Sequence, residues 1–210
     1  LLHHCRTLDI VPFWANLHDP LAVKGQGPGV YLFEPPELAG FTPDPGKPTP
    51  EAGRAAGLSL DLACDLALAR DVAGLVTLPL HKAMLKSGGF DFPGHTEFLA
   101  QRAGLGPHEV CMHLAGERLR VSLVTTHPPL RLVPELINRE RILHCLQLTW
   151  DMMRCLGHNA PIAVCGLNPH AGEDGTIGLE EKEIIEPAIA EAVSLGIPAQ
   201  GPFPGDTIFH

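Results

Sequence analysis

Residues 161–196, PIAVCGLNPHAGEDGTIGLEEKEIIEPAIAEAVSLG, hold one complete strand–loop–helix unit. The run PIAVCGL is a short apolar segment of the kind that forms a buried strand. The segment LEEKEIIEPAIAEAVSLG repeats apolar residues at helical spacing and ends at Gly196, a common helix stop. The Pro- and Gly-rich NPHAGEDG between them indicates a loop. This succession predicts one unit of an α/β sheet.

The same alternation of strands and helices extends over most of the chain. Apolar spacing predicts helices over about 51–70 and 133–155, and another that starts near residue 96. Apolar runs predict strands at 30–33 and 73–80, and a hairpin from 110–116 and 120–126. The predicted fold class is therefore α/β, with a mixed, mostly parallel sheet and flanking helices. We expect one region, with a loop-rich segment over 1–49 and an α/β core over 50–210.

Composition excludes several classes of protein. The formal net charge of −9 argues against nucleic acid or an anionic membrane surface as a partner. The sequence contains no run of about 18 apolar residues, so no transmembrane helix is expected. Aromatic residues make up only 5% of the chain, so the core should consist mainly of Leu, Val, Ile and Ala. The six cysteines are scattered without a CxxC pair and are interpreted as small buried residues of a reduced, cytoplasmic protein.

Three histidines follow predicted strands directly or closely. His81 follows GLVTLPL, His127 follows RVSLVTT, and His170 comes three residues after PIAVCGL. Ligands of α/β proteins gather beyond the carboxyl ends of the strands, and neutral imidazoles bind divalent transition metals. His127 and His170 are therefore candidate metal ligands. Hydrogen-bonded turn histidines remain the alternative.

The segment FPGHTEF predicts an anion site at the start of a helix. Free backbone N–H groups and the helix dipole favour an anion there, and His95 with Thr96 would complete a phosphate or carboxylate cradle. The alternative is a simple Thr96 N-cap beside an exposed histidine.

Other polar residues give weaker signals. Asp206 in a Gly/Pro loop is a candidate for proton handling, with a turn cap as the alternative. Glu180, Glu181 and Glu183 are interpreted as the solvated first turn of a helix. Neither a GxxxxGK[ST] phosphate loop nor a GxGxxG fingerprint is present.

Taken together, these segments resemble the 4-hydroxythreonine-4-phosphate dehydrogenase (PdxA) family. The matching stretches are EAGRAAGLSLDLA, VTLPLHKAMLKSGGFDFPGHTEFLA, RVSLVTTHPPLRLVPELI, GLNPHAGEDGTIGLEE and GPFPGDTIF. The resemblance implies the isocitrate/isopropylmalate-dehydrogenase-like fold and a homodimer with its active sites at the interface. It also implies metal binding by His127 and His170, and binding of the substrate's phosphate end by His95 and Thr96.

The chain also departs from the family pattern. A GEPAGIGP-like segment and the third metal-binding histidine of an HDQG-like motif are absent, Leu78 stands where many members have a small residue, and Asp174 replaces a common glycine. The chain lacks an initial methionine, and we expect it to be an internal piece of a longer protein.

The reaction that the resemblance implies is a metal-dependent oxidation of 4-phosphohydroxy-L-threonine by NAD or NADP. Decarboxylation then gives 3-amino-2-oxopropyl phosphate, a step towards pyridoxal 5'-phosphate (vitamin B6). The metal could be zinc, magnesium, manganese or cobalt. One alternative is a related dehydrogenase of D-threonate or D-erythronate 4-phosphate, or of an arene cis-dihydrodiol carboxylate. A second is a truncated, non-catalytic chain that dimerises or binds metal.

Overall fold

The computed structural model describes residues 2–92, 94–106 and 108–209. The chain forms two compact units that divide between Ala103 and Gly104, here called the N-terminal and C-terminal units. In the residues described, no helix is long and apolar enough to cross a membrane.

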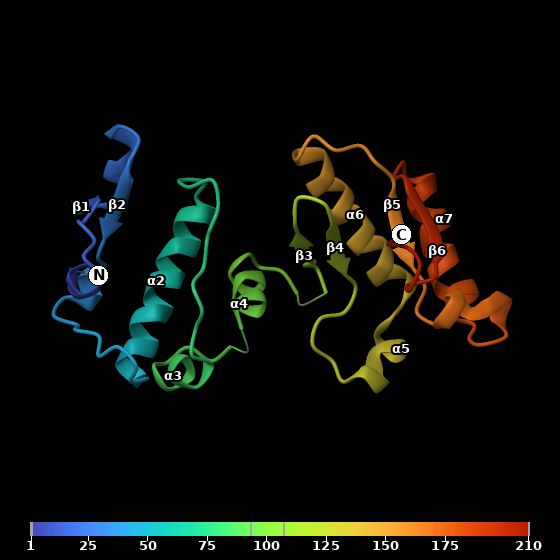
Figure 1. The fold of residues 1–210 in the computed structure, drawn as a ribbon, viewed down its shortest axis with the longest axis horizontal. Coiled ribbons are helices and arrows are strands. Elements are labelled where there is room, and N and C mark those ends of the chain that lie inside the picture. The colour runs from blue at the N-terminus through green and yellow to red at the C-terminus, as the bar shows by residue number, and fades with distance from the viewer. Residues whose placement is uncertain (1, 93, 107, 210) are drawn as a thin grey trace. The chain divides into compact units, whose positions relative to one another are not determined.

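The N-terminal unit combines a small parallel sheet with helices (Figure 1). A short helix, α1, precedes strands β1 and β2, which pair in parallel with Trp14 opposite Val30. The predicted strand at 30–33 is thus confirmed, whereas β1 was not singled out in the sequence. The bounds are α1 Leu2–Thr7, β1 Trp14–Leu17, β2 Val30–Phe33, α2 Pro50–Leu68, α3 Lys82–Ser87 and α4 His95–Arg102, with 3-10 turns at Pro20–Gly25 and Pro36–Leu38.

The long helix α2 confirms the helix predicted over about 51–70. Thr49 is its N-cap, because the Thr49 hydroxyl accepts a hydrogen bond from the Ala52 N–H at 3.1 Å, and Pro50 occupies the first turn. The buried face of α2 includes Gly53, where α3 crosses closely. A Cβ built on Gly53 would overlap the main-chain carbonyl of Met84, so only glycine permits this approach.

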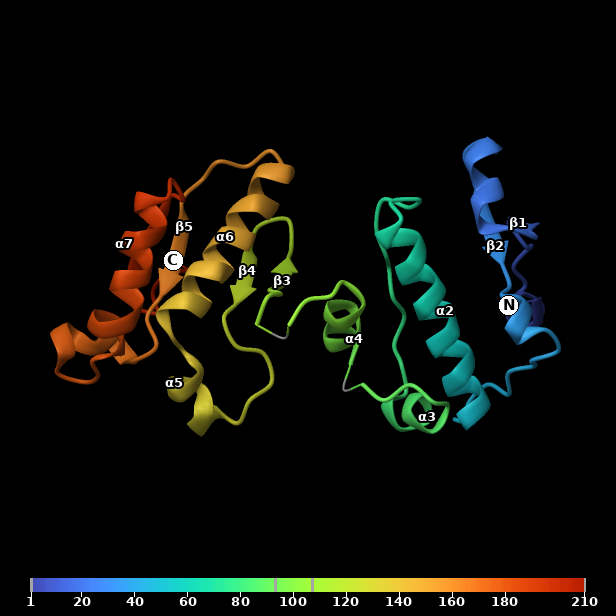
Figure 2. The ribbon, with the colours of Figure 1, turned by 180° about the vertical axis from the view of Figure 1, so that it is seen from behind.

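The predicted buried strand at 73–80 is wrong. The segment is extended and runs beside α2 (Figures 1 and 2), but it has no strand pairing in the described residues. Leu75 and Leu80 pack against the cluster of Leu60, Cys64 and Phe98. Val76 is 98% exposed and Leu78 79% exposed, so one side of the segment lacks a cover. Apolar patterning predicted its extended backbone correctly but could not supply a neighbouring strand.

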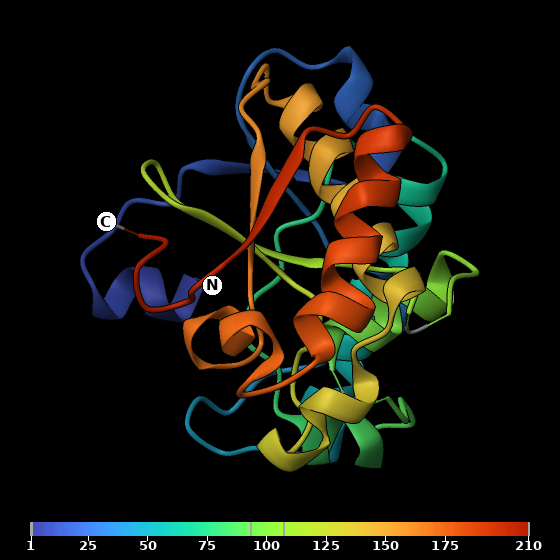
Figure 3. The ribbon, with the colours of Figure 1, turned by 90° about the vertical axis from the view of Figure 1, so that its right-hand side faces the viewer.

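In the C-terminal unit, an antiparallel hairpin precedes a parallel strand pair with helices against it. The predicted hairpin is confirmed as β3 with β4, and β5 confirms the strand predicted within 161–167. β5 pairs in parallel with β6, and Figure 3 shows α7 lying along this pair. The bounds are β3 Met112–Ala115, β4 Arg120–Leu123, α5 Val133–Leu136, α6 Arg139–Cys155, β5 Ile162–Cys165, α7 Glu186–Ser194 and β6 Ala199–Phe203.

The single helix predicted over 133–155 is wrong, because the chain breaks into α5 and α6. Ile137 is extended, with φ −82° and ψ 120°. The Asn138 side chain then accepts a hydrogen bond from the Arg141 N–H at 2.8 Å and starts a new helix. Asn is among the strongest N-cap residues, so it restarts the helix here despite the continuous apolar spacing. A 3-10 turn at Leu130–Leu132 precedes α5.

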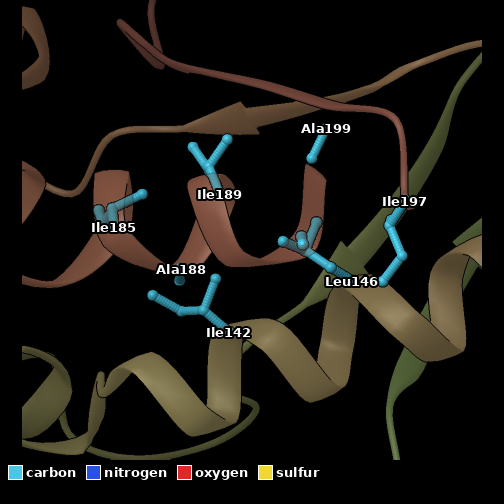
Figure 4. Packing of buried hydrophobic residues seen from close by; sticks show 8 residues of the cluster. Ile142, Leu146, Ile185, Ala188, Ile189, Ile197 and Ala199 are labelled. Atoms are coloured by element: carbon cyan, nitrogen blue, oxygen red, sulfur yellow. The ribbon is translucent and has the colours of Figure 1, made fainter. Parts of the chain in front are cut away.

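The core of the C-terminal unit is aliphatic, as the composition predicted. Ile142 and Leu146 of α6 face α7, whose Ala188 is fully buried (Figure 4). Ile197 and Ala199 close the cluster beside β6. Small residues on α7 let the two helices approach closely, as in other close-packed interiors.

The glycine at the crossing of α2 and α3 gives a test of this packing. We expect Gly53→Ala to lower the free energy of unfolding by about 1–3 kcal/mol, the usual cost of overpacking, even though alanine is the better helix former. Gly74→Ala is the matched control, because a Cβ there meets no atom within 4 Å. Urea unfolding measures both variants. Equal stability of Gly53→Ala and the parent protein would contradict the close crossing.

Candidate functional site

The loop that follows β5 has an unusual backbone. His170, Ala171, Glu173 and Asp174 all have positive φ, from 43° to 58°, and Gly172 and Gly175 are also left-handed. A left-handed turn costs non-glycine residues roughly 1–2 kcal/mol each, so surrounding interactions must hold it. His and Asp adopt this conformation more readily than most residues, which accommodates His170 and Asp174.

The carboxylate of Glu181 binds the start of this loop through hydrogen bonds. One oxygen, Oε1, accepts hydrogen bonds from the N–H groups of Leu167 and Asn168, both at 2.7 Å. The other, Oε2, accepts one from the Asn168 side-chain amide at 2.9 Å. Glu181 is only 2% exposed, so its interpretation as part of a solvated helix face is wrong. Glu180 and Glu183 are more exposed.

Glycines let the loop close over this carboxylate. A Cβ on Gly172 would lie 2.6 Å from Glu181 Oε2, and one on Gly178 would overlap the Asn168 side chain. The carboxylate belongs to a π-turn at Glu181–Ile185 that leads into α7. The loop is therefore fixed directly to the first turn of the helix that follows it.

The ionisation of Glu181 follows from these contacts. Burial raises the pKa of the Glu181 carboxyl, but the hydrogen bonds from Asn168 and Leu167 together outweigh burial, so the pKa lies below its ordinary value. Glu181 is thus a buried anion at neutral pH, stabilised by main-chain and side-chain N–H donors.

His127 lies on an exposed segment that leaves β4. Arg141 fixes the start of this segment, because its Nε donates to the Val124 carbonyl at 3.0 Å. The same guanidinium donates through Nη1 to the carbonyls of His108 and Val110, at 2.6 and 2.9 Å. Pro129 then begins the next 3-10 turn. The segment is held on both sides of His127.

The two candidate metal ligands have free ring nitrogens. His127 and His170 are both exposed, and neither imidazole makes a hydrogen bond to the part of the chain that the structure describes. Both follow strands that pack against α6. Among all the residues that the structure describes, no group of three or more His, Cys, Asp or Glu side chains is arranged to hold a metal ion. Two imidazoles suit a divalent transition ion but supply only part of its coordination, so metal binding remains a prediction.

His81 has a structural role. It is the N-cap of α3, and its Nδ1 accepts a hydrogen bond from the Met84 N–H at 3.4 Å. Residues 74–80, which lead into it, pair with no strand in the part of the chain that the structure describes, so the strand exit predicted at this position is wrong.

His95 and Thr96 occupy the first turn of α4, as predicted. The N-cap is Gly94, which makes no side-chain cap, so the alternative of a Thr96 N-cap is wrong. The Nε2 atom of His95 is buried without a hydrogen-bond partner in the described residues. A buried ring nitrogen without a partner is costly, and each such group in a folded protein calls for an explanation.

Lys82 is a basic residue near this helix start that the sequence interpretation missed. A Cβ built on Gly94 would lie 3.9 Å from Lys82 Nζ and 3.1 Å from the Glu97 carboxylate. Glu97 folds towards the helix N-terminus as an acid in the third helical position commonly does. The helix N-terminus and the ammonium group both favour negative charge there, and the Glu97 carboxylate now occupies part of that place. A lysine directly after PLH, at the predicted strand exit, was the available sequence signal.

Asp206 is exposed in a turn three residues beyond β6. Its role in proton handling stays a prediction.

The cysteines agree only in part with the prediction that they are small buried residues. Cys5, Cys64 and Cys145 are buried, Cys111 is half-buried, and Cys155 and Cys165 are exposed.

Glu181→Gln tests the hold on the His170 loop. Glutamine cannot accept hydrogen bonds with both side-chain atoms, so we expect a loss of about 1–3 kcal/mol in the free energy of unfolding. Glu183→Gln, on the exposed face of the same π-turn, should change little.

The pH dependence of stability follows from the lowered pKa of Glu181. Glu181 contributes stability above the ordinary glutamate value of about 4.5, and that stability is lost as the pH falls below it. The free energy of unfolding, measured at several pH values, should therefore change less with pH in Glu181→Gln than in the parent protein. The same pH dependence in both proteins would refute this role of Glu181.

Comparison with known proteins adds to this geometry. The family described as "Pyridoxal phosphate biosynthetic protein PdxA" matches residues 20–210. The 4-hydroxythreonine-4-phosphate dehydrogenase of Desulfosudis oleivorans is 41% identical over 211 residues, covering 92% of this chain and 62% of that protein.

Solved structures agree. The 4-hydroxythreonine-4-phosphate dehydrogenase of Klebsiella pneumoniae superposes with a TM-score of 0.83 at 34% identity, over 99% of this chain and 63% of the other. A terephthalate 1,2-cis-dihydrodiol dehydrogenase of Burkholderia xenovorans superposes at 0.67 with 21% identity, over 96% of this chain and 62% of that one, which shows the fold alone.

The predicted α/β fold of the isocitrate/isopropylmalate-dehydrogenase-like class is thus confirmed. The chain spans between about half and 62% of the length of the first curated relatives that it matches. A family match over residues 20–210, together with these relatives, shows that the chain belongs to the PdxA family.

Proposed function

We propose that the protein containing this chain oxidises 4-phosphohydroxy-L-threonine with NAD or NADP. Loss of CO2 then yields 3-amino-2-oxopropyl phosphate, a precursor of pyridoxal 5'-phosphate. The observation that carries the proposal is the family match over residues 20–210, within which the chain has two exposed imidazoles without hydrogen bonds to the described residues and a helix start beside a lysine. The named relatives are dehydrogenases of this substrate.

The metal would be held in part by His127 and His170. Their exposed rings, without hydrogen bonds to the described residues, fit the donor set of zinc, manganese, cobalt or, less commonly, magnesium. A bound divalent ion supplies Lewis-acid charge next to the substrate oxygen atoms. The left-handed loop orients the His170 imidazole, and the Arg141 clamp at Val124 orients the segment of His127.

The phosphate group would bind at the start of α4. Lys82 supplies positive charge, the helix N-terminus supplies N–H donors, and His95 Nε2 supplies a hydrogen bond without having to release another partner. Thr96 adds a hydroxyl in the same first turn. Fixing the phosphate end orients the reacting carbon towards the nicotinamide. Asp206 is proposed to transfer protons during the reaction.

We infer a cytoplasmic homodimer with its active sites at the subunit interface. The third metal-binding histidine and part of the nucleotide site would come from segments other than residues 1–210, which fits the larger size of the relatives.

Substrate assays of the full-length protein test the function. We expect turnover of 4-phosphohydroxy-L-threonine and a much lower kcat/KM for D-threonate 4-phosphate, D-erythronate 4-phosphate and an arene cis-dihydrodiol carboxylate. No turnover of the first substrate would refute the proposal. Metal binding without turnover of any of the four would favour a non-catalytic protein.

Substitution of the two histidines tests the metal assignment. His127→Ala and His170→Asn should each weaken binding of zinc or manganese by at least about tenfold, since loss even of a group that only orients a ligand costs that much. Asparagine is chosen at 170 because it also tolerates a left-handed backbone. His18→Ala, an exposed histidine of the N-terminal unit, is the control. Calorimetric titration gives the dissociation constants, and unchanged values in both variants would exclude the site.

Lys82→Ala tests the phosphate cradle. Loss of a charged donor should raise the KM for the phosphorylated substrate by about tenfold or more, while kcat falls less. Lys86→Ala is the matched control on α3, since Lys86 pairs with Asp91 instead. Equal KM values for the two variants would place the phosphate elsewhere.

A further inference from the structure

Two thiols of the C-terminal unit lie beside the same main-chain carbonyl at the end of β4. Cys111 directly precedes β3, and Cys145 lies on α6. The sulfur of Cys111 is 3.7 Å from the Leu123 carbonyl oxygen, and the sulfur of Cys145 is 3.8 Å from the same atom. The Cys145 thiol is near enough to favour a Cys111 thiolate by hydrogen bonding. The fold therefore brings together two cysteines that are distant in the sequence.

The contact makes the two thiols unequal acids. The hydrogen bond from Cys145 lowers the pKa of Cys111; burial opposes it, but the Arg141 guanidinium and Leu123 main chain assist, and the pKa falls to about 7. The same hydrogen bond, with burial, raises the pKa of Cys145. At neutral pH Cys111 is thus partly a thiolate, and Cys145 holds the proton. Only the thiolate is a nucleophile.

Two of the other cysteines, Cys64 and Cys165, lack this combination. Cys165 is exposed, but burial of its sulfur raises the pKa of its thiol, and burial does the same at Cys64. Exposure alone therefore does not make the most reactive thiol of this chain.

We propose that Cys111 is a site of thiol modification and that Cys145 resolves the adduct by forming a Cys111–Cys145 disulfide. The co-reactant is a low-molecular-weight disulfide such as oxidised glutathione. The Cys111 thiolate attacks one sulfur of that disulfide and expels one small thiolate. Once Cys111 is in the mixed disulfide, its thiolate no longer raises the pKa of Cys145. Cys145 then releases its proton to solvent and attacks the Cys111 sulfur, which expels the second small thiolate. The protein dithiol loses two electrons, and the small disulfide gains them.

The disulfide would tether the hairpin to α6. It would act next to Val124, whose carbonyl Arg141 already holds, and therefore at the start of the segment that carries His127. The proposal does not depend on the proposed function, because neither sulfur is assigned to substrate or metal.

Peptide mapping of the full-length protein tests the proposal. After incubation with oxidised glutathione at pH 7 and digestion without reductant, we expect mass spectrometry to find the peptides of Cys111 and Cys145 cross-linked. Cys145→Ser should accumulate a glutathione adduct on Cys111, because the resolving thiol is gone. Cys111→Ser should give neither the cross-link nor an adduct on Cys145. Cys165→Ser is the control and should cross-link as the parent protein does.

The parent protein decides the matter if a serine variant folds poorly, since its own cross-linked peptide is the primary result. Modification of Cys155 or Cys165 while Cys111 and Cys145 stay free to alkylation would overturn the proposal. So would a folded Cys145→Ser protein that carries no adduct on Cys111.

Discussion

The hydrogen bonds to the buried Glu181 carboxylate are the interaction on which the candidate metal-binding loop depends. Three N–H donors converge on it, two from the main chain just after β5 and one from the Asn168 side chain. Hydrogen bonds to a charged group are stronger than neutral ones and are comparable in size to the strain of a left-handed residue. The carboxylate thus holds a backbone that His170 and its neighbours would otherwise leave.

This arrangement connects the functional loop to the core. Glu181 begins the π-turn that leads into α7, and α7 packs its alanines against α6. Lys182, the next residue, donates to the Asp174 carbonyl at 2.5 Å and holds the far side of the loop. The position of His170 therefore depends on a helix whose own place is set by aliphatic packing, which is the general way in which rigid elements preorganise a site.

Local sequence patterns were sufficient where each element is specified by its own residues. Thr49 and Pro50 start α2, and the spacing of apolar residues carries it to Leu68. Patterns failed where a neighbour decides: the segment with Val76 is extended but lacks a partner strand among the described residues, and Asn138 interrupts an apolar periodicity that looked continuous. Periodicity shows which face of an element is apolar. It does not show what packs on that face, or where an N-cap residue ends one helix and begins another.

The candidate site shows the same division. Placement of His95 at a helix start and of His170 in a Pro/Gly loop was predictable, because caps and turns are local. The burial of Glu181 was not, since an acid in a first helical turn is normally solvated and only the left-handed loop folds over it. Lys82 was missed because it lies on α3, and its closeness to Gly94 at the start of α4 depends on how the two helices pack.

The uncovered segment at 73–80 has a consequence for handling the chain. AGLVTLPL contains no charged residue and only one proline, whereas natural sheet edges are protected by lysines, prolines or bulges. With Val76 and Leu78 exposed, its main-chain donors and acceptors are a template for another extended segment. Residues 1–210 produced alone should therefore be prone to self-association at high concentration, and a charged substitution at Val76 should improve their solubility.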